Sequence, residues 1–297
     1  MRPWSIMKKG FAVGFVLLFL GTPITSSHEQ MLGGSSSNPL GNTLYVGGSG
    51  SGNYTKIQDA IDNASDGDTV FVYDDSSPYY EKVKVDKSIH LVGEDQRTTV
   101  IDNPDSMNLL SITVALTADE ATFTGFTVRN GGRFIGIDLC LNSNHSTIIG
   151  NIFIGNSSPA PLVTAIIISD STDNIIKENT VSSSAVGVYV YASHDTTITG
   201  NNITKNRGYG IELYNARRNT ISKNNIMENG DHDASFYRDI GILPLSNHWD
   251  ANYWGKPHVL PKRIPGQMIL LQTDQVTLTL PLVNFDWHPA QKPYVLP

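Results

Sequence analysis

Two acidic residues hold equivalent places in a repeated motif and are the first candidates for acid–base chemistry. The motif is a small residue followed by apolar, any and apolar residues, and its third position holds Asp138 in one copy and Glu212 three repeats later. If successive repeats stack as strands, these carboxyl groups lie about 14 Å apart. Inverting glycosidases need roughly 6.5–9.5 Å between their carboxyl groups, and retaining ones need about 5–5.5 Å. The spacing therefore excludes a glycosidase pair.

The other reactive residue types form no recognisable centre. The eight histidines are scattered, and the nearest approach to a cluster is His248, His258 and His288. No histidine or cysteine pair has metal-site spacing, and methionine is sparse. The single cysteine, Cys140, permits no disulfide within the chain and lies in no catalytic motif. We therefore predict no catalytic residue, no metal and no cofactor.

Aromatic residues in the same motif could bind sugar. Alternation along a strand turns Tyr189 and Tyr191 outward on one repeat and Glu212 and Tyr214 outward on the next, with Asp138 farther along. Aromatic faces stack on sugar rings, while hydroxyl and carboxylate groups bond to sugar hydroxyls. We predict that this tyrosine strip binds a glycan. The alternative is that tyrosine simply suits an exposed strand.

Two sequence motifs recur with nearly the same spacing, and they predict the strands and turns that would position these residues. The small-residue motif begins at 136, 165, 187 and 210, which are spacings of 29, 22 and 23. An asparagine motif recurs at 28, 22 and 23. Such a period is typical of solenoid coils, which bury their apolar positions only by stacking. We predict an all-β, right-handed parallel β-helix rather than a β-sandwich, which needs no fixed phase. Stacked amides should form a structural ladder at Asn151, Asn179, Asn201 and Asn224.

The two ends of such a solenoid need covers, because they expose strand edges. Apolar residues at helical spacing in 54–64 predict a short capping helix. Over residues 247–297 the repeat gives way to an aromatic-rich, irregular C-terminal cap, after a β-helix domain spanning 42–246. We expect Trp249, Trp254 and Trp287 to plug the core, the alternative being that they stack on sugar.

The first 27 residues have the pattern of a secretory signal peptide. Basic residues precede a ten-residue apolar run at 11–20, which is short of the roughly 20 residues that span a bilayer. An uncleaved anchor is the alternative, and residues 28–41 read as a flexible linker. Signal removal would take three of the 21 basic residues and leave 18 against 28 acidic ones. We therefore expect a secreted, periplasmic or cell-surface protein without a membrane span and without nucleic acid as a partner.

Several segments resemble a known superfamily. Residues 52–73, 80–83 (YEKV) and 91–93 (LVG) resemble the start of pectin-lyase-like β-helix proteins. The repeats resemble those of carbohydrate-binding proteins and sugar hydrolases, in the NosD-like branch that includes periplasmic copper-site maturation proteins. The endings at 247–255 and 283–289 resemble archaeal cell-surface members. The resemblance implies the fold, but function must be argued from a site.

The sequence lacks the motifs that are typical of the enzymes of this superfamily. Residues 111–116 (SITVAL) occupy the place of a pectinesterase glutamine segment, and no DFIFG-like segment follows. We predict an exported, non-catalytic β-helix that binds or presents a polysaccharide or a cell-envelope glycan. A polysaccharide lyase, epimerase or esterase with an unrecognised site is one alternative. A NosD-like metal-delivery accessory protein is the other. An acid cluster with Arg or Lys on neighbouring coils of one face would favour the enzyme.

Overall fold

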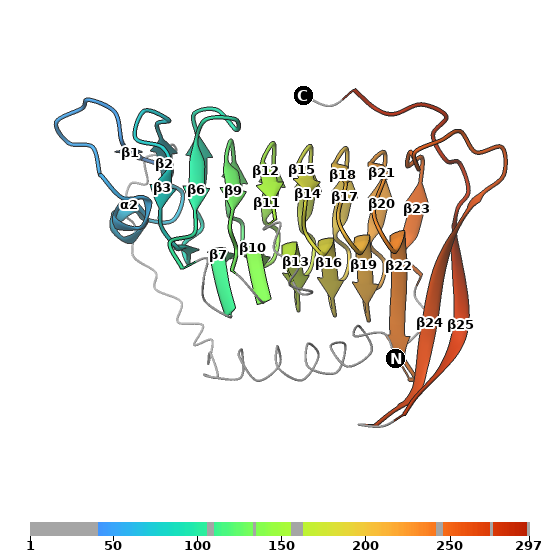
Figure 1. The fold of residues 1–297 in the computed structure, drawn as a ribbon. Helices are drawn as coiled ribbons and strands as arrows, with labels where there is room; N and C mark the ends of the chain where they lie inside the picture. Colours follow the sequence, from blue (N-terminus) through green and yellow to red (C-terminus); the bar gives the residue numbers. More distant parts are fainter. Residues whose placement is uncertain are drawn as a thin grey trace.

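The computed structural model describes residues 41–105, 110–132, 135–155, 163–241, 246–273 and 276–295. Its strands stack in parallel from one end of the molecule to the other, and a long hairpin crosses the far end (Figure 1). The prediction of an all-β parallel β-helix is confirmed. The predicted signal peptide and all but the last residue of the predicted linker lie outside the described residues.

Apart from the C-terminal hairpin, the described strands form three faces, because each complete coil contributes one strand to each face. The first face holds β1 (Thr43–Val46), β2 (Thr69–Val72), β5 (His90–Gly93), β8 (Thr122–Thr124), β11 (Thr147–Ile149), β14 (Ile175–Lys177), β17 (Thr197–Thr199), β20 (Thr220–Ser222) and β23 (His248–Asp250). The second face holds β3 (Tyr79–Tyr80), β6 (Val100–Asp102), β9 (Thr127–Arg129), β12 (Ile152–Ile154), β15 (Thr180–Ser182), β18 (Asn202–Thr204) and β21 (Asn225–Met227). The third face holds β4 (Val83–Val85), β7 (Leu110–Leu116), β10 (Ile135–Leu141), β13 (Thr164–Ser169), β16 (Val186–Tyr191), β19 (Tyr209–Tyr214) and β22 (His232–Asp239).

The core is built from rows of equivalent residues on successive coils. On the first face one row pairs in strict register and is buried throughout: Ile148, Ile176, Ile198, Ile221 and Trp249. Each aliphatic side chain buried in such a row stabilises the fold by roughly 1.5–3 kcal/mol. Because the row ends in Trp249, the repeat continues into the predicted cap with a larger residue.

The asparagines of the repeat form a continuous amide chain beside this row. Each Nδ2 donates to the Oδ1 of the next coil's asparagine, at 3.1 Å from Asn151 to Asn179 and from Asn179 to Asn201, and at 2.9 Å from Asn201 to Asn224. The chain continues from Asn224 to Asn252 at 2.9 Å. A turn places each amide inward, because the preceding residue adopts a left-handed backbone: Gly150, Glu178, Gly200, Lys223 and Ala251.

The N-terminal end is covered by α2 (Ile57–Asn63), within the segment predicted to form a capping helix. It buries Ile57, Ala60 and Ile61 against the first coils. The carboxylate of Glu81 accepts the free N–H groups of Ile57 and Gln58 at 2.9 and 3.1 Å, which satisfies the start of the helix.

The C-terminal end is covered by two tryptophans and an antiparallel hairpin of β24 (Lys262–Gln272) and β25 (Thr277–Asp286). Trp249 and Trp254 are buried with ring centroids 6.0 Å apart. Asp286 is buried beside them and accepts the Nδ2 of Asn252 at 3.1 Å, so a carboxylate terminates the amide chain. The plug prediction is wrong for Trp287, which is 61% exposed. Alternation along the chain turns Asp286 inward and therefore Trp287 outward.

Candidate functional site

The structure brings the predicted tyrosine strip together on β16 and β19. Tyr189 pairs with Glu212, and Tyr191 with Tyr214. The ring of Tyr191 stacks on Tyr189 at 6.4 Å and on Tyr214 at 5.8 Å between centroids. The Tyr214 hydroxyl donates to Asp239 at 2.8 Å. These rings therefore contact each other and stand half-buried.

Glu212 is not the exposed carboxylate that the sequence predicts, because it is buried to 8% exposure. Tyr189 lies beside it in register. Burial, followed by the negative charge of Glu212, raises the pKa of the Tyr189 hydroxyl well above its usual value. Burial likewise raises the pKa of Tyr209, with a smaller contribution from Glu212. The aromatic neighbours thus enclose the carboxylate and remove it from the surface.

The predicted position of Asp138 in the same row is wrong. Leu139 pairs with Ile166, which pairs with Val188, so Asp138 is equivalent to Gly187 rather than to Tyr189. The coil spacing at this point is 27 residues rather than the 29 inferred from the motif. Asp138 is also fully buried, because the segment before β10 crosses over it. A Cβ added to Gly131 in that segment would come within 2.6–2.8 Å of the β10 backbone.

Asp138 belongs to a polar cluster that holds this crossing in place. Its Oδ1 accepts the Gly131 N–H at 3.0 Å, whereas its Oδ2 has no partner among the described residues. Burial raises the pKa of Asp138 well above its usual value, because the charged form is poorly solvated there. The nearby Asp102 accepts Arg129 Nε at 2.8 Å and Asn130 Nδ2 at 2.6 Å. Acids and an arginine on neighbouring coils are thus present, but their bonds are structural.

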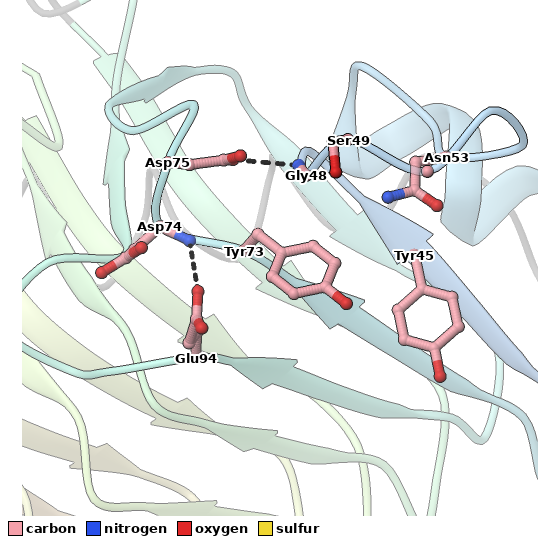
Figure 2. A pocket seen from close by; sticks show the side chains of 9 residues that line it. Tyr45, Gly48, Ser49, Asn53, Tyr73, Asp74, Asp75 and Glu94 are labelled. Atoms are coloured by element: carbon pink, nitrogen blue, oxygen red, sulfur yellow. Dashed lines mark hydrogen bonds between the residues drawn. The ribbon is translucent and has the colours of Figure 1, made fainter.

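A different surface offers open aromatic faces, at the N-terminal end of the helix. Tyr45 on β1 pairs with Phe71 on β2, and Tyr73 follows β2 immediately. The centroids of Tyr45 and Tyr73 lie 6.0 Å apart with 22° between their planes. Figure 2 shows the two rings side by side with their faces turned the same way. Phe71 supports Tyr73 from the edge at 5.1 Å.

These rings line a hollow of about 520 Å³ (Figure 2). A glycine-rich loop forms one wall, and Gly48 has a φ of +70° that only glycine adopts without strain. Gly48 donates its N–H to Asp75 Oδ1 at 2.9 Å, and Asn53 Nδ2 donates to the Gly47 carbonyl at 2.5 Å. These bonds hold the loop over the rings, so the hollow is shaped before any ligand enters.

The hollow is polar and negatively charged at its rim. Asp74, Asp75 and Glu94 line it, and none of the lining residues that the structure describes is basic. The Asp74 N–H donates to Glu94 at 3.0 Å. Behind the wall, the Tyr79 hydroxyl donates to the Tyr73 carbonyl at 2.6 Å. Burial and the charge of Asp75 raise the pKa of Tyr79 to about 12, so this hydroxyl remains a donor.

The sequence prediction missed the hollow because its residues come from three coils and belong to no repeat. The signals that were present are the alternating aromatics at 45, 71 and 73 and the glycine-rich segment 47–52. A rim of carboxylates and an aromatic floor can bond to hydroxyls and stack on a sugar ring.

A comparison with protein-family models matches residues 61–257 to the family described as "Periplasmic copper-binding protein (NosD)". The chain belongs to the NosD family. A search of curated proteins finds no match.

The copper in the description of the NosD family does not fit the described residues. They contain no group of three or more His, Cys, Asp or Glu side chains that could hold a metal ion. Burial raises the pKa of the Cys140 thiol to about 12, whereas a thiol must lose its proton to bind a metal. Of the three histidines that lie nearest to a cluster in the sequence, His288 is hydrogen-bonded to a carboxylate, because its Nδ1 lies 2.8 Å from Oδ1 of Asp250.

Three solved structures that are similar to this NosD-family chain have names of enzymes that act on polysaccharides. Pectin methylesterase PemA from Erwinia chrysanthemi has a TM-score of 0.49 and 11% identity, covering 82% of this chain and 86% of that one. An alginate lyase from Paenibacillus sp. has a TM-score of 0.44 and 13% identity, covering 72% and 85%. The periplasmic alginate epimerase AlgG has a TM-score of 0.43 and 15% identity, covering 71% and 48%. Similarity at this level does not extend to activity or substrate.

The part of the chain that the structure describes has no helix long and apolar enough to cross a membrane.

Proposed function

We propose that this protein is an exported, non-catalytic β-helix protein that binds a glycan in the N-terminal hollow. The observation that carries the proposal is the pair of tyrosine rings, Tyr45 and Tyr73, turned the same way in a preformed hollow of about 520 Å³. Tyr45 is 42% exposed, so its ring remains available to a ligand. The periplasmic description of the NosD family supports export. The polysaccharide ligands of β-helix enzymes motivate the choice of a sugar.

The surroundings of the acids support binding rather than catalysis. A general acid or base must reach the reacting atom within about 3 Å. Asp138 is fully buried under the segment before β10, and Asp102 bonds to Arg129 and Asn130. Neither carboxyl is presented to a ligand in this conformation. The metal-delivery alternative has no donor cluster among the described residues.

The charge of the rim predicts which glycans bind. Asp74, Asp75 and Glu94 repel a chain of uronic acids, because no basic residue is among the described residues that line the hollow and like charges facing each other cost binding free energy. Neutral sugars avoid this repulsion and can accept or donate hydrogen bonds at the rim. The hollow should therefore take a neutral oligosaccharide and reject pectin-like or alginate-like chains.

The test is a glycan array with neutral and uronic oligosaccharides, followed by calorimetry on each hit. Tyr45→Ala and Tyr73→Ala should each weaken binding about tenfold, since each removes one stacking face. Tyr80→Ala is the matched control, because Tyr80 is 66% exposed and lies outside the hollow. The double variant Tyr189→Ala, Tyr214→Ala tests the predicted strip in parallel and should bind like the parent.

Three results would count against the proposal. Equal loss in the Tyr80 variant would mean that the effect is not specific to the hollow. Loss of binding in the strip variant alone would move the site to β16 and β19. Shortened or modified oligosaccharide products, found by mass spectrometry after incubation, would support the enzyme alternative instead.

A further inference from the structure

Exposed apolar side chains gather at the C-terminal end of this protein. Most of the large apolar residues exposed in the described ranges lie between 240 and 295. The most exposed pair in a single loop is Val259 at 99% and Leu260 at 76%. Elsewhere the coils turn mainly polar residues to solvent, so this concentration marks the cap as a contact surface.

The loop that carries Val259 and Leu260 is held in position. Pro257 and Pro261 bound it, and both restrict the backbone. Gln291 Nε2 donates to the His258 carbonyl at 2.7 Å, which ties the loop to the chain after β25. The two apolar side chains are therefore presented outward by a constrained turn.

The base of the hairpin, which begins directly after this loop, also exposes apolar side chains. Arg263 pairs with Phe285, and Pro265 pairs with Val283. The rings of Phe285 and Trp287 lie 5.1 Å apart, and Trp287 is 61% exposed. The cap face, as we name it, comprises Val259, Leu260, Val283, Phe285 and Trp287.

Two exposed basic residues, Lys256 and Arg263, flank the cap face, although the chain as a whole carries −7. The Lys262 ammonium lies 5.4 Å from the centroid of the buried Trp254 ring, and the neighbouring acid, Asp286, is fully buried. Neither Lys256 nor Arg263 forms an ion pair with any residue that the structure describes. Burial, and then the charges of Lys262 and Lys256, lower the pKa of His258, and the charge of Asp286 opposes this shift.

We propose that the cap face docks on the surface of an anionic phospholipid bilayer. Aliphatic and tryptophan side chains enter the interfacial region of a bilayer, and flanking Lys and Arg side chains contact acidic headgroups. Both features are present here on one constrained surface. A second copy of the chain fits less well, because a twofold contact through this face would oppose its basic residues.

The test is flotation of the full chain with two kinds of vesicle, one of phosphatidylcholine alone and one with phosphatidylglycerol added. The parent should bind the anionic vesicles at least tenfold more tightly. The double variant Lys256→Glu, Arg263→Glu should weaken binding to anionic vesicles at least fivefold for each residue replaced. Its binding to neutral vesicles should be the same as that of the parent. Val259→Ser with Leu260→Ser should weaken binding to both kinds of vesicle.

A matched control reverses two exposed basic residues at the other end of the molecule, Lys56→Glu with Arg97→Glu. This pair changes the net charge equally and should retain binding. The proposal is overturned if the parent fails to bind anionic vesicles, or if the control loses as much affinity as the cap-face variant. It is also overturned if sedimentation shows a dimer that the Val259, Leu260 variant abolishes, because the face would then bind a second copy. Glycan binding is measured without lipid, so the two proposals fail independently.

Discussion

Replacing one rung of the amide chain should reveal how much the ladder contributes to stability. Asn201 is buried at 1% exposure in the middle of the chain. Its Nδ2 donates to the Ile176 carbonyl at 2.8 Å, to the Thr199 carbonyl at 3.1 Å and to Asn224 Oδ1 at 2.9 Å. Its Oδ1 accepts the backbone N–H of Asn179 at 2.9 Å. The same Oδ1 accepts the Asn179 Nδ2 at 3.1 Å. The Asn201→Leu variant fills a similar volume and removes all five bonds.

The magnitude follows from the groups that lose a partner. The Asn179 N–H and the Ile176 carbonyl are left without the side chain that satisfies them in a buried turn. Each unsatisfied buried group costs about 1–3 kcal/mol, and burial of the leucine returns part of this. We expect the free energy of unfolding to fall by about 2–4 kcal/mol.

Urea unfolding followed by circular dichroism and tryptophan fluorescence measures this change. Two probes are needed because stacked repeats can unfold in more than one step. Asn202→Leu is the matched control, since Asn202 is the next residue, is half-buried and forms no side-chain hydrogen bond in the described structure. It should change stability by no more than about 0.5 kcal/mol. The reasoning fails if Asn201→Leu costs no more than the control.

Three further predictions concern two buried carboxyl groups and one close backbone crossing. Burial raises the pKa of Asp138, so the unfolded chain releases this proton above about pH 4 while the folded chain keeps it. Stability therefore falls as the pH rises toward the folded pKa, and Asp138→Asn should flatten this fall in melting temperatures measured from pH 3 to 8. Asp286→Ala removes the acceptor of Asn252 and Trp254 and should cost about 2–4 kcal/mol in urea unfolding, whereas a cost below 1 kcal/mol would mean that water replaces the carboxylate. Gly131→Ala should lower the melting temperature because its Cβ has no room against β10, and an unchanged value would contradict the close crossing.

The fold was predictable because each copy of the repeat has the same pattern of apolar residues and asparagines, and therefore the same need to be buried by the next coil. The two repeats predicted stacked coils that bury their apolar positions, and Ile148, Ile176, Ile198 and Ile221 form one such buried row. The period also predicted parallel pairing, since only stacked coils bury these positions. The continuation of the amide chain through Asn252 to Asp286 was not predicted, because an aspartate from a distant strand ends it.

The candidate site was less predictable because it depends on register and on connections between coils. Motif alignment placed Asp138 beside the tyrosines, but β10 shifts the row by two residues. Alternation along the strand correctly predicted that Glu212 points away from the core. It could not predict that the rings of neighbouring tyrosines cover the carboxylate and bury it. The hollow joins Tyr45, Tyr73 and Glu94 from separate coils, and no local pattern links them.

The arrangement of the ladder suggests why both proposed surfaces lie at the ends. In the middle coils, each asparagine side chain accepts a hydrogen bond from the asparagine of the coil before it and donates one to the asparagine of the coil after it. A substitution there therefore disturbs two neighbouring coils at once. At the ends, one neighbour is absent and must be replaced by residues that do not follow the repeat. The side chains of such residues, including Tyr45 at one end and Leu260 at the other, are not part of the amide chain. They can therefore vary with a ligand or a surface at small cost to the fold, which makes the ends the places where function can be added to this solenoid.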